Sequence, residues 1–187
     1  MKAPLRAQAK GRTAPPGASE AIQRRLMAQD WWAAAFQAGL YRSTPAEPST
    51  DALLADLLAR GAQVAVPMRR GDAYGWGWVD CATRWKARAH GILEPETAAA
   101  APAAELRVVV VPGLAFDAKG GRLGHGHGHF DRLLADTRAL LVGLCFENRL
   151  LEAVPMEPHD VRMDVVATEK NLFFAPTAEA KLNRLLG

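Results

Sequence analysis

The stretch whose residues are best suited to binding or catalysis is GRLGHGHGHFDR at residues 121–132. In it, three histidines alternate with glycines before a Phe-Asp-Arg sequence. Glycines permit positive φ angles and let several backbone N–H groups face one point, which suits a phosphate. Imidazoles at alternate positions could instead hold zinc, nickel or copper. A flexible loop without a ligand is the third interpretation. The residues alone leave all three open.

The elements around this loop decide where it lies. Residues 106–111, LRVVVV, form an unbroken apolar run, typical of a central strand that is covered on both faces. The loop follows this strand and leads into a predicted helix through Phe130, Leu133 and Leu134. In open α/β sheets ligands bind at the carboxyl ends of the strands, and a helix that begins near Phe130 adds partial positive charge. The position therefore favours a phosphate site.

Strands and helices alternate along the rest of the chain. Helices are predicted from Ser19 towards Trp32, from Thr50 to Gly61, and after Thr177, with each start at a residue that can cap a helix. Further strands are predicted near residues 40–41 and at 63–67, 71–80, 139–146 and 165–168, with loops at 44–50, 98–104 and 154–164. This alternation predicts an α/β fold: one domain of three layers, α/β/α, with a mostly parallel central sheet.

Composition narrows the class of protein. The chain has 187 residues, which fits a single domain over residues 1–187. Its 23 basic and 20 acidic residues are too balanced to predict nucleic-acid binding. No apolar run approaches the roughly 20 residues of a membrane span. Cys81 and Cys145 form no CxxC pair and are typical of buried thiols in a reducing compartment.

The N-terminal segment is basic and lacks the apolar core of a secretion signal. We therefore expect a cytoplasmic protein, with residues 1–18 as a flexible arm. No obligate protein partner is evident from the sequence.

The loop and its surroundings resemble the signature of the 5-formyltetrahydrofolate cyclo-ligase family, also called methenyltetrahydrofolate synthetases. That family shows PGLAFD, a short variable gap and RLG-x-G-x-GYYDR, and this chain has PGLAFDAKGGRLGHGHGHFDR at residues 112–132. Five more pieces resemble the family in the right order: K-x-x-LR at 2–6, TPAEPSTD at 44–51, HGILEP at 90–95, LLVGLCFE at 140–147 and EPHDVRMDVVATE at 157–169. Single pieces are weak evidence, but six in order are strong.

The resemblance implies an enzyme that uses ATP and Mg²⁺ to convert 5-formyltetrahydrofolate into 5,10-methenyltetrahydrofolate, with release of ADP and phosphate. The formyl group is a neutral amide, and its oxygen is a poor leaving group. Transfer of the γ-phosphoryl group to this oxygen would activate it, and attack by the neighbouring N10 would close the ring as phosphate leaves. Such a transfer depends mostly on positioning and charge neutralisation.

The resemblance also assigns residues to the site. ATP would contact Lys2, Arg6, Arg122, Leu123, Gly124, His125, Gly126, His127, Gly128, His129 and Phe130. The folate would contact Thr44, Glu47, His125, His127 and His129. Asp131 and Asp160 would hold magnesium, a hard cation that prefers carboxylate and phosphate oxygens.

The chain departs from the family pattern within the loop itself. His129-Phe130 replace the usual Tyr-Tyr, so Phe130 keeps the ring and loses the hydroxyl. His127 stands at a variable position where Lys or Gly is frequent, and a histidine protonated beside phosphates would supply positive charge there. Ser49 stands where an acid is usual. Two alternatives remain: a related protein that binds nucleotide or folate without this activity, and a histidine-rich metal-binding protein.

Overall fold

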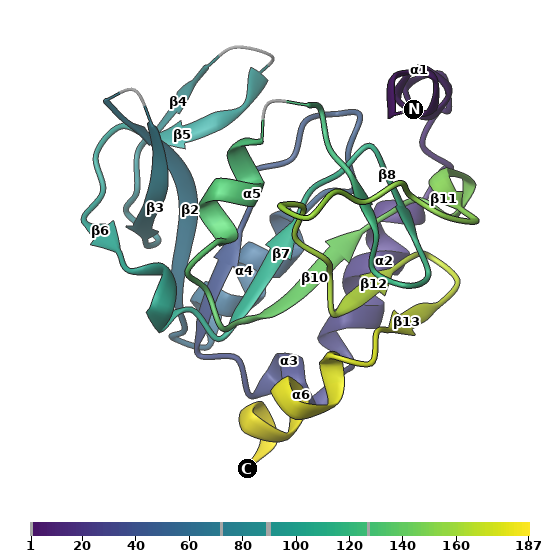
Figure 1. Ribbon diagram of the computed structural model, residues 1–187. Helices are drawn as coiled ribbons and strands as arrows, with labels where there is room; N and C mark the ends of the chain where they lie inside the picture. Colours follow the sequence, from purple (N-terminus) through teal and green to yellow (C-terminus); the bar gives the residue numbers. More distant parts are fainter. Residues whose placement is uncertain (1, 72, 89–90, 127) are drawn as a thin grey trace.

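A mostly parallel sheet forms the centre of the protein, as the alternation of elements predicts. The computed structural model describes residues 2–71, 73–88, 91–126 and 128–187 (Figure 1). Within these residues an eight-stranded sheet has the order β13-β12-β10-β7-β1-β2-β3-β6. Neighbours from β12 to β2 pair in parallel, whereas β13, β3 and β6 pair antiparallel. The strands are β1 (Gln37–Leu40), β2 (Gln63–Arg70), β3 (Ala73–Val79), β6 (Ala100–Ala101), β7 (Val108–Val111), β10 (Leu140–Leu144), β12 (Val165–Ala167) and β13 (Leu172–Phe174).

Helices cover both faces of this sheet and complete the three layers. Alternate side chains of β7 divide between the two cores: Val108 and Val110 belong to one, Val109 and Val111 to the other. The first core packs against α2 (Ala18–Met27), α3 (Asp30–Ala33), α4 (Asp51–Ala59) and α6 (Ala178–Leu186). The second packs against α5 (His129–Leu134), which lies on the opposite face (Figure 1). All four β7 side chains are fully buried, as expected of a central strand.

The segment predicted as a flexible arm differs in the structure. Residues Lys2–Lys10 form helix α1, which lies at one edge of the molecule (Figure 1). Ala9 is only 1 % exposed and shares a small apolar cluster with Leu114, Leu123 and Val154, against which Leu5 also packs. This helix was not predicted, because its first turn has no acidic residue and the residue before it is not one that caps helices.

Two smaller sheets surround the glycine-rich loop and were not predicted. The first joins β11 (Leu150–Leu151), β8 (Ala115–Asp117) and β9 (Arg122–Leu123) beneath α1. The second is the hairpin of β4 (Trp85–Ala87) and β5 (Leu93–Pro95). Strands of two or three residues carry too little periodicity to be read from sequence. Both sheets nevertheless position residues of the candidate site.

The predicted helix starts fall within a residue of the observed ones, but the capping groups act differently. Thr50 Oγ1 donates to the Tyr41 carbonyl at 2.7 Å, and Thr177 Oγ1 donates to Asp164 Oδ1 at 2.7 Å. Neither side chain bonds its own helix. The first of these contacts ties α4 to the segment that follows β1, which forms one wall of the site.

Candidate active site

A cavity of about 1250 Å³ lies at the carboxyl ends of β1 and β7. Tyr41 directly follows β1 and Pro112 directly follows β7, and both line the cavity. The other walls come from α1, from the 44–47 loop, from β3, from the β4–β5 hairpin and from the glycine-rich loop with α5. Ligands are expected at this position in an open α/β sheet. The cavity exceeds the usual range for a drug-sized ligand and has room for two substrates.

Nearly all of the predicted site residues meet in this cavity. Those that line it are Lys2, Arg6, Thr44, Glu47, Arg122, Gly124, His125, Gly126, Gly128, His129, Phe130, Asp131 and Asp160. Leu123 does not, because its side chain is fully buried in the cluster beneath α1. His127 lies outside the residues that the structure describes. The elements that carry these side chains are far apart in sequence, so their convergence is a result of the fold.

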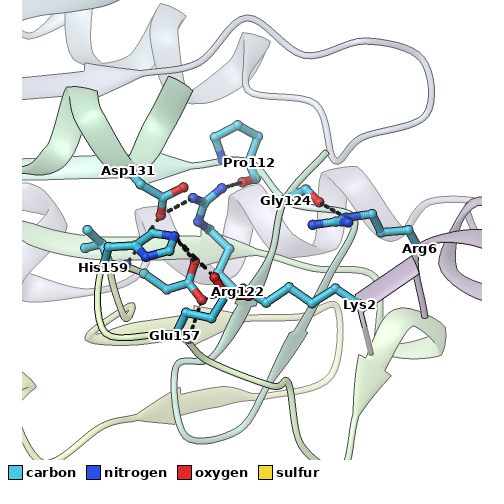
Figure 2. Close-up of polar contacts among 10 residues, drawn as sticks. Lys2, Arg6, Pro112, Arg122, Gly124, Asp131, Glu157 and His159 are labelled. Carbon is cyan, nitrogen blue, oxygen red and sulfur yellow. Dashed lines mark hydrogen bonds and ion pairs between the residues drawn. The ribbon is translucent and has the colours of Figure 1, made fainter. Parts of the chain in front are cut away.

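An ion pair between Arg122 and Asp131 lies at the base of the loop (Figure 2). Arg122 Nη2 lies 2.7 Å from Asp131 Oδ1, and the two side chains are 7 % and 18 % exposed. The backbone N–H of Val161 donates to the same Oδ1 at 3.3 Å. Arg122 Nε is buried and has no hydrogen-bond partner in the structure. The pair therefore fixes the carboxylate at the start of α5 and places a guanidinium beside the loop.

Lys2 joins the N-terminal helix to the 157–160 segment. Its Nζ lies 2.5 Å from Asp160 Oδ2 and 3.3 Å from Glu157 Oε1 (Figure 2). Burial lowers the pKa of Lys2, but the hydrogen bonds and charges of the two carboxylates outweigh it and hold the pKa above its ordinary value. For Asp160, burial acts in the opposite direction and raises the pKa. The hydrogen bonds from Lys2 and from the Glu157 N–H outweigh burial and hold the pKa of Asp160 below its ordinary value. Both groups are therefore charged near neutral pH.

Arg6 connects the same helix to the glycine-rich loop. Its Nε donates to the Gly124 carbonyl at 2.9 Å (Figure 2). Gly126 has φ of 102° and Gly128 has φ of 64°, conformations that strongly favour glycine. A Cβ at Gly126 would also lie 3.3 Å from the Arg6 guanidinium carbon. The glycines thus allow the loop to pass close to the Arg6 guanidinium.

The helix that follows contributes less than the sequence suggested. Helix α5 has six residues and begins after Gly128, whose left-handed conformation sets the turn. Because the partial charge of a helix end comes from its first few N–H groups, a short helix still presents positive potential, but a smaller one. The side-chain cations Lys2, Arg6 and Arg122 add full positive charges to the lining of the cavity.

The 44–47 loop forms a different wall and is held by its own carboxylate. Glu47 Oε2 accepts hydrogen bonds from the N–H and from the hydroxyl of Thr44, both at 2.9 Å. Tyr41 anchors the loop's far end by donating to the Pro48 carbonyl at 2.6 Å. Burial, followed by the charge of Glu47, raises the pKa of Tyr41 well above its ordinary value. A fixed carboxylate in a cavity suits a ligand that presents N–H donors.

Sequence reasoning missed several residues of the opposite wall. Glu94 on β5 is 3 % exposed and accepts from Arg88 Nε at 3.2 Å. Burial, together with the charge and a hydrogen bond of Glu94, raises the pKa of Tyr74. The Tyr74 ring lies 5.2 Å from that of His129. The available signal was a single acid in the otherwise apolar segment GILEP, which alone does not predict a site.

The carboxylates of the site fit magnesium held together with phosphate. Asp131 and Asp160 lie close, because the residue after Asp160 donates its N–H to Asp131. Both are hard oxygen donors, but each is already paired with a cation, Arg122 or Lys2. Across the described ranges no group of three or more His, Cys, Asp or Glu side chains could hold a metal ion. The donor set therefore suits Mg²⁺ only if phosphate oxygens and water complete its shell.

The fold and cavity together define a class: a three-layer α/β protein with clustered cations facing a glycine-rich loop. The 5-formyltetrahydrofolate cyclo-ligase family model matches residues 1–169, so the chain belongs to that family. A cyclo-ligase of Mycolicibacterium smegmatis is 39% identical over 140 residues, which are 70% of this chain and 72% of that protein.

Solved structures agree with this assignment. The 5,10-methenyltetrahydrofolate synthetase of Aquifex aeolicus superposes with a TM-score of 0.82 at 26% identity, covering 94% of this chain and 93% of that one. The synthetase of Mycoplasma pneumoniae has a TM-score of 0.70 at 16% identity over 90% of this chain and 98% of that one, and at that identity it supports the fold alone.

Proposed function

We propose that this protein is an ATP-dependent ligase that converts 5-formyltetrahydrofolate into 5,10-methenyltetrahydrofolate. The proposal rests on one observation: a single cavity has one wall of cations suited to phosphate and a separate wall with a carboxylate. The first has Lys2, Arg6 and Arg122 around a glycine-rich loop, and the second has Glu47. A reaction between ATP and a folate requires both substrates in one enclosed space.

The reaction balances with these two substrates. The formyl oxygen attacks the γ-phosphorus, the bond to ADP breaks, and an iminium phosphate forms at N5. N10 then attacks the formyl carbon and loses its proton. The carbon–oxygen bond breaks, and inorganic phosphate leaves with the former formyl oxygen. The protein supplies position and charge compensation rather than a covalent partner.

The residues divide between the two substrates. Lys2, Arg6, Arg122 and the loop from Gly124 to Phe130 bind the ATP phosphates, where the cations stabilise the charge that develops during transfer. Thr44 and Glu47 bind the folate, together with His125, His127 and His129. Within the loop, Gly124, Gly126 and Gly128 bring the backbone close to the phosphates, and His129 contacts the cavity beside Tyr74.

Magnesium belongs to the ATP side of this scheme. Asp131 and Asp160 would hold it, and it would neutralise charge on the β- and γ-phosphates. Binding of Mg-ATP would require Lys2 and Arg122 to exchange carboxylate contacts for phosphate contacts. The ion pairs thus keep both cations ordered until ATP arrives.

No helix among the described residues is long and apolar enough to cross a membrane. Cys145 is buried, with a pKa raised by burial to about 12, and Cys81 is exposed; both are free thiols. Free thiols support a reducing compartment such as the cytoplasm.

A spectrophotometric assay tests the proposal. Purified protein with 5-formyltetrahydrofolate and Mg-ATP should generate the absorbance of the methenyl product, with one ADP formed per product. Omission of ATP should abolish the signal, and EDTA inhibition should be reversed by magnesium alone. Binding of both ligands without product would instead identify a non-catalytic relative, and a requirement for zinc would identify a metal-binding protein.

A further inference from the structure

A single buried arginine outside the cavity connects the two substrate walls. Arg149, the last residue of the short 3-10 helix η3 (Glu147–Arg149), donates from Nη1 to the Ala46 carbonyl at 2.7 Å. It also donates to the Arg12 carbonyl, from Nη2 at 2.6 Å and from Nε at 3.2 Å. All three donor nitrogens of its guanidinium are thus used on backbone carbonyls of two distant segments.

Those two segments lead directly into the proposed binding groups. Arg12 lies two residues after α1, the helix that carries Lys2 and Arg6. Ala46 lies in the loop that carries Thr44 and Glu47. Neither segment is fixed to the other by strand pairing. Arg149 therefore stands at the junction of the ATP side and the folate side.

The surroundings of Arg149 favour a rigid clamp. The residue is 5 % exposed, and its guanidinium carbon lies 5.3 Å from the centre of the Phe146 ring. Burial lowers the pKa of Arg149, while the nearby groups of Cys145 and Glu47 oppose that effect. A buried cation satisfied mainly by carbonyls is costly to form, so its hydrogen bonds must hold a defined geometry.

The base of the clamp is itself anchored. Directly after Arg149, β11 pairs in parallel with β8, with Leu150 opposite Phe116. The neighbouring Asn148 reinforces the N-terminal contact: its Nδ2 donates to the Thr13 carbonyl at 2.9 Å, and its own carbonyl accepts from Arg12. The N-terminal segment is thus held twice, and the 44–47 loop is held by Arg149 alone among the residues of η3.

We propose that Arg149 is a positioning residue that sets the distance between the ATP-binding helix and the folate-binding loop. Arg149 is not among the residues that line the cavity. Its effect on the reaction would come from holding the two segments in the arrangement that binds both substrates, so that its loss weakens the binding of each. This inference rests on the proposed function for its kinetic consequences, but not for its structural ones.

The test compares Arg149→Met with Arg60→Met in the full chain. Arg60 is the control, because its Nη1 and Nη2 also donate to backbone carbonyls, those of Ala33 and Trp32 at 2.8 and 2.9 Å; it differs from Arg149 in being half-buried and in pairing through Nε with Asp56 at 3.1 Å. Arg60 and both acceptors lie away from the cavity. The first readout is amide hydrogen exchange of the unliganded proteins, followed at residues 9–13 and 44–47. The second is the set of KM values for ATP and for 5-formyltetrahydrofolate.

Arg149→Met should speed exchange in both segments and raise both KM values by about fivefold or more, with a smaller effect on kcat. Arg149→Lys should recover part of this, because one ammonium can reach fewer carbonyls. Asn148→Ala should raise the KM for ATP alone. Arg60→Met should change neither exchange in these segments nor KM. If Arg149→Met does not fold, hydrogen exchange and the two KM values are compared between Arg149→Lys and Arg60→Lys instead, with the same outcomes expected.

Faster exchange in only one segment, or KM values like those of Arg60→Met, would overturn the proposal. Absence of turnover in the wild-type protein would reject the proposed function instead. The exchange measurement would then still decide whether Arg149 holds both segments.

Discussion

Replacement of Asp131 by asparagine separates the chemistry of the site from its stability. The change keeps the size of the side chain and an oxygen that can accept from Arg122 and Val161. It removes the charge opposite Arg122, whose side chain is only 7 % exposed. Hydrogen bonds to charged groups contribute about 1.5–3 kcal/mol, and the asparagine keeps part of that. We expect a loss of about 1–3 kcal/mol in the free energy of unfolding, and a Tm lower by roughly 2–10 °C.

The effect on turnover should be far larger than this loss of stability implies. The asparagine has an NH₂ group in place of one carboxylate oxygen and no negative charge, so it is a poor ligand for Mg²⁺. Loss of a group that stabilises charge in the transition state costs about 100-fold or more in kcat. The assay is methenyl formation at saturating Mg-ATP, with circular dichroism and a thermal melt on the same preparation.

Asp164→Asn provides the matched control. Asp164 is 2 % exposed and pairs with Lys181 at 2.7 Å, while its oxygens also accept from the Leu141 N–H and the Thr177 hydroxyl. It lies outside the cavity. Asp164→Asn should therefore lose comparable stability and retain turnover. Near-normal activity in Asp131→Asn, or an equal loss of activity in both variants, would refute the role of Asp131.

Three further outcomes follow from the geometry. Removal of residues 2–10 should raise the KM for ATP strongly and also lower Tm, because Ala9 is buried; unchanged ATP kinetics would show that α1 is not part of the site. The Lys2–Asp160 pair should stabilise the fold between about pH 4 and pH 10.5. The pKa of Asp160 is lowered, so its contribution to stability is lost as pH falls below this range. The pKa of Lys2 is raised, so its contribution is lost as pH rises above the range. Lys2→Met should remove that contribution at both ends of a pH series of thermal melts, and a series identical to wild type would contradict it. Glu47→Gln should raise the KM for the folate and leave that for ATP within about twofold, so a selective effect on ATP would reverse the assignment of the two walls.

The sheet and its order of elements could be predicted because the signals are strong and local. The apolar run Val108–Val111 is fully buried, as predicted, and the helix predicted from Thr50 to Gly61 is α4, whose Leu53, Leu54 and Leu57 are buried at helical spacing. Both patterns depend on periodicity within one element. The position of the glycine-rich loop at the carboxyl end of β7 then followed from the general rule for open α/β sheets.

Contacts between distant segments could not be predicted. Helix α1 owes its order to the apolar cluster that includes Leu114 and Val154, which lie over a hundred residues away in sequence. The pairing of Arg122 with Asp131 and of Lys2 with Asp160 likewise depends on the fold. Sequence similarity named these residues but gave no reason for their arrangement. Leu123 was included in the ATP site only because it lies within the motif, and its side chain is buried elsewhere.

The central claim is that the cavity brings the γ-phosphoryl group of ATP to the formyl oxygen of the folate. Turnover of 5-formyltetrahydrofolate labelled with ¹⁸O in the formyl group tests this directly, with mass analysis of the inorganic phosphate released. Phosphoryl transfer to that oxygen predicts one ¹⁸O atom in each phosphate, equal to the amount of methenyl product. Label found in water, with unlabelled phosphate, would contradict the account.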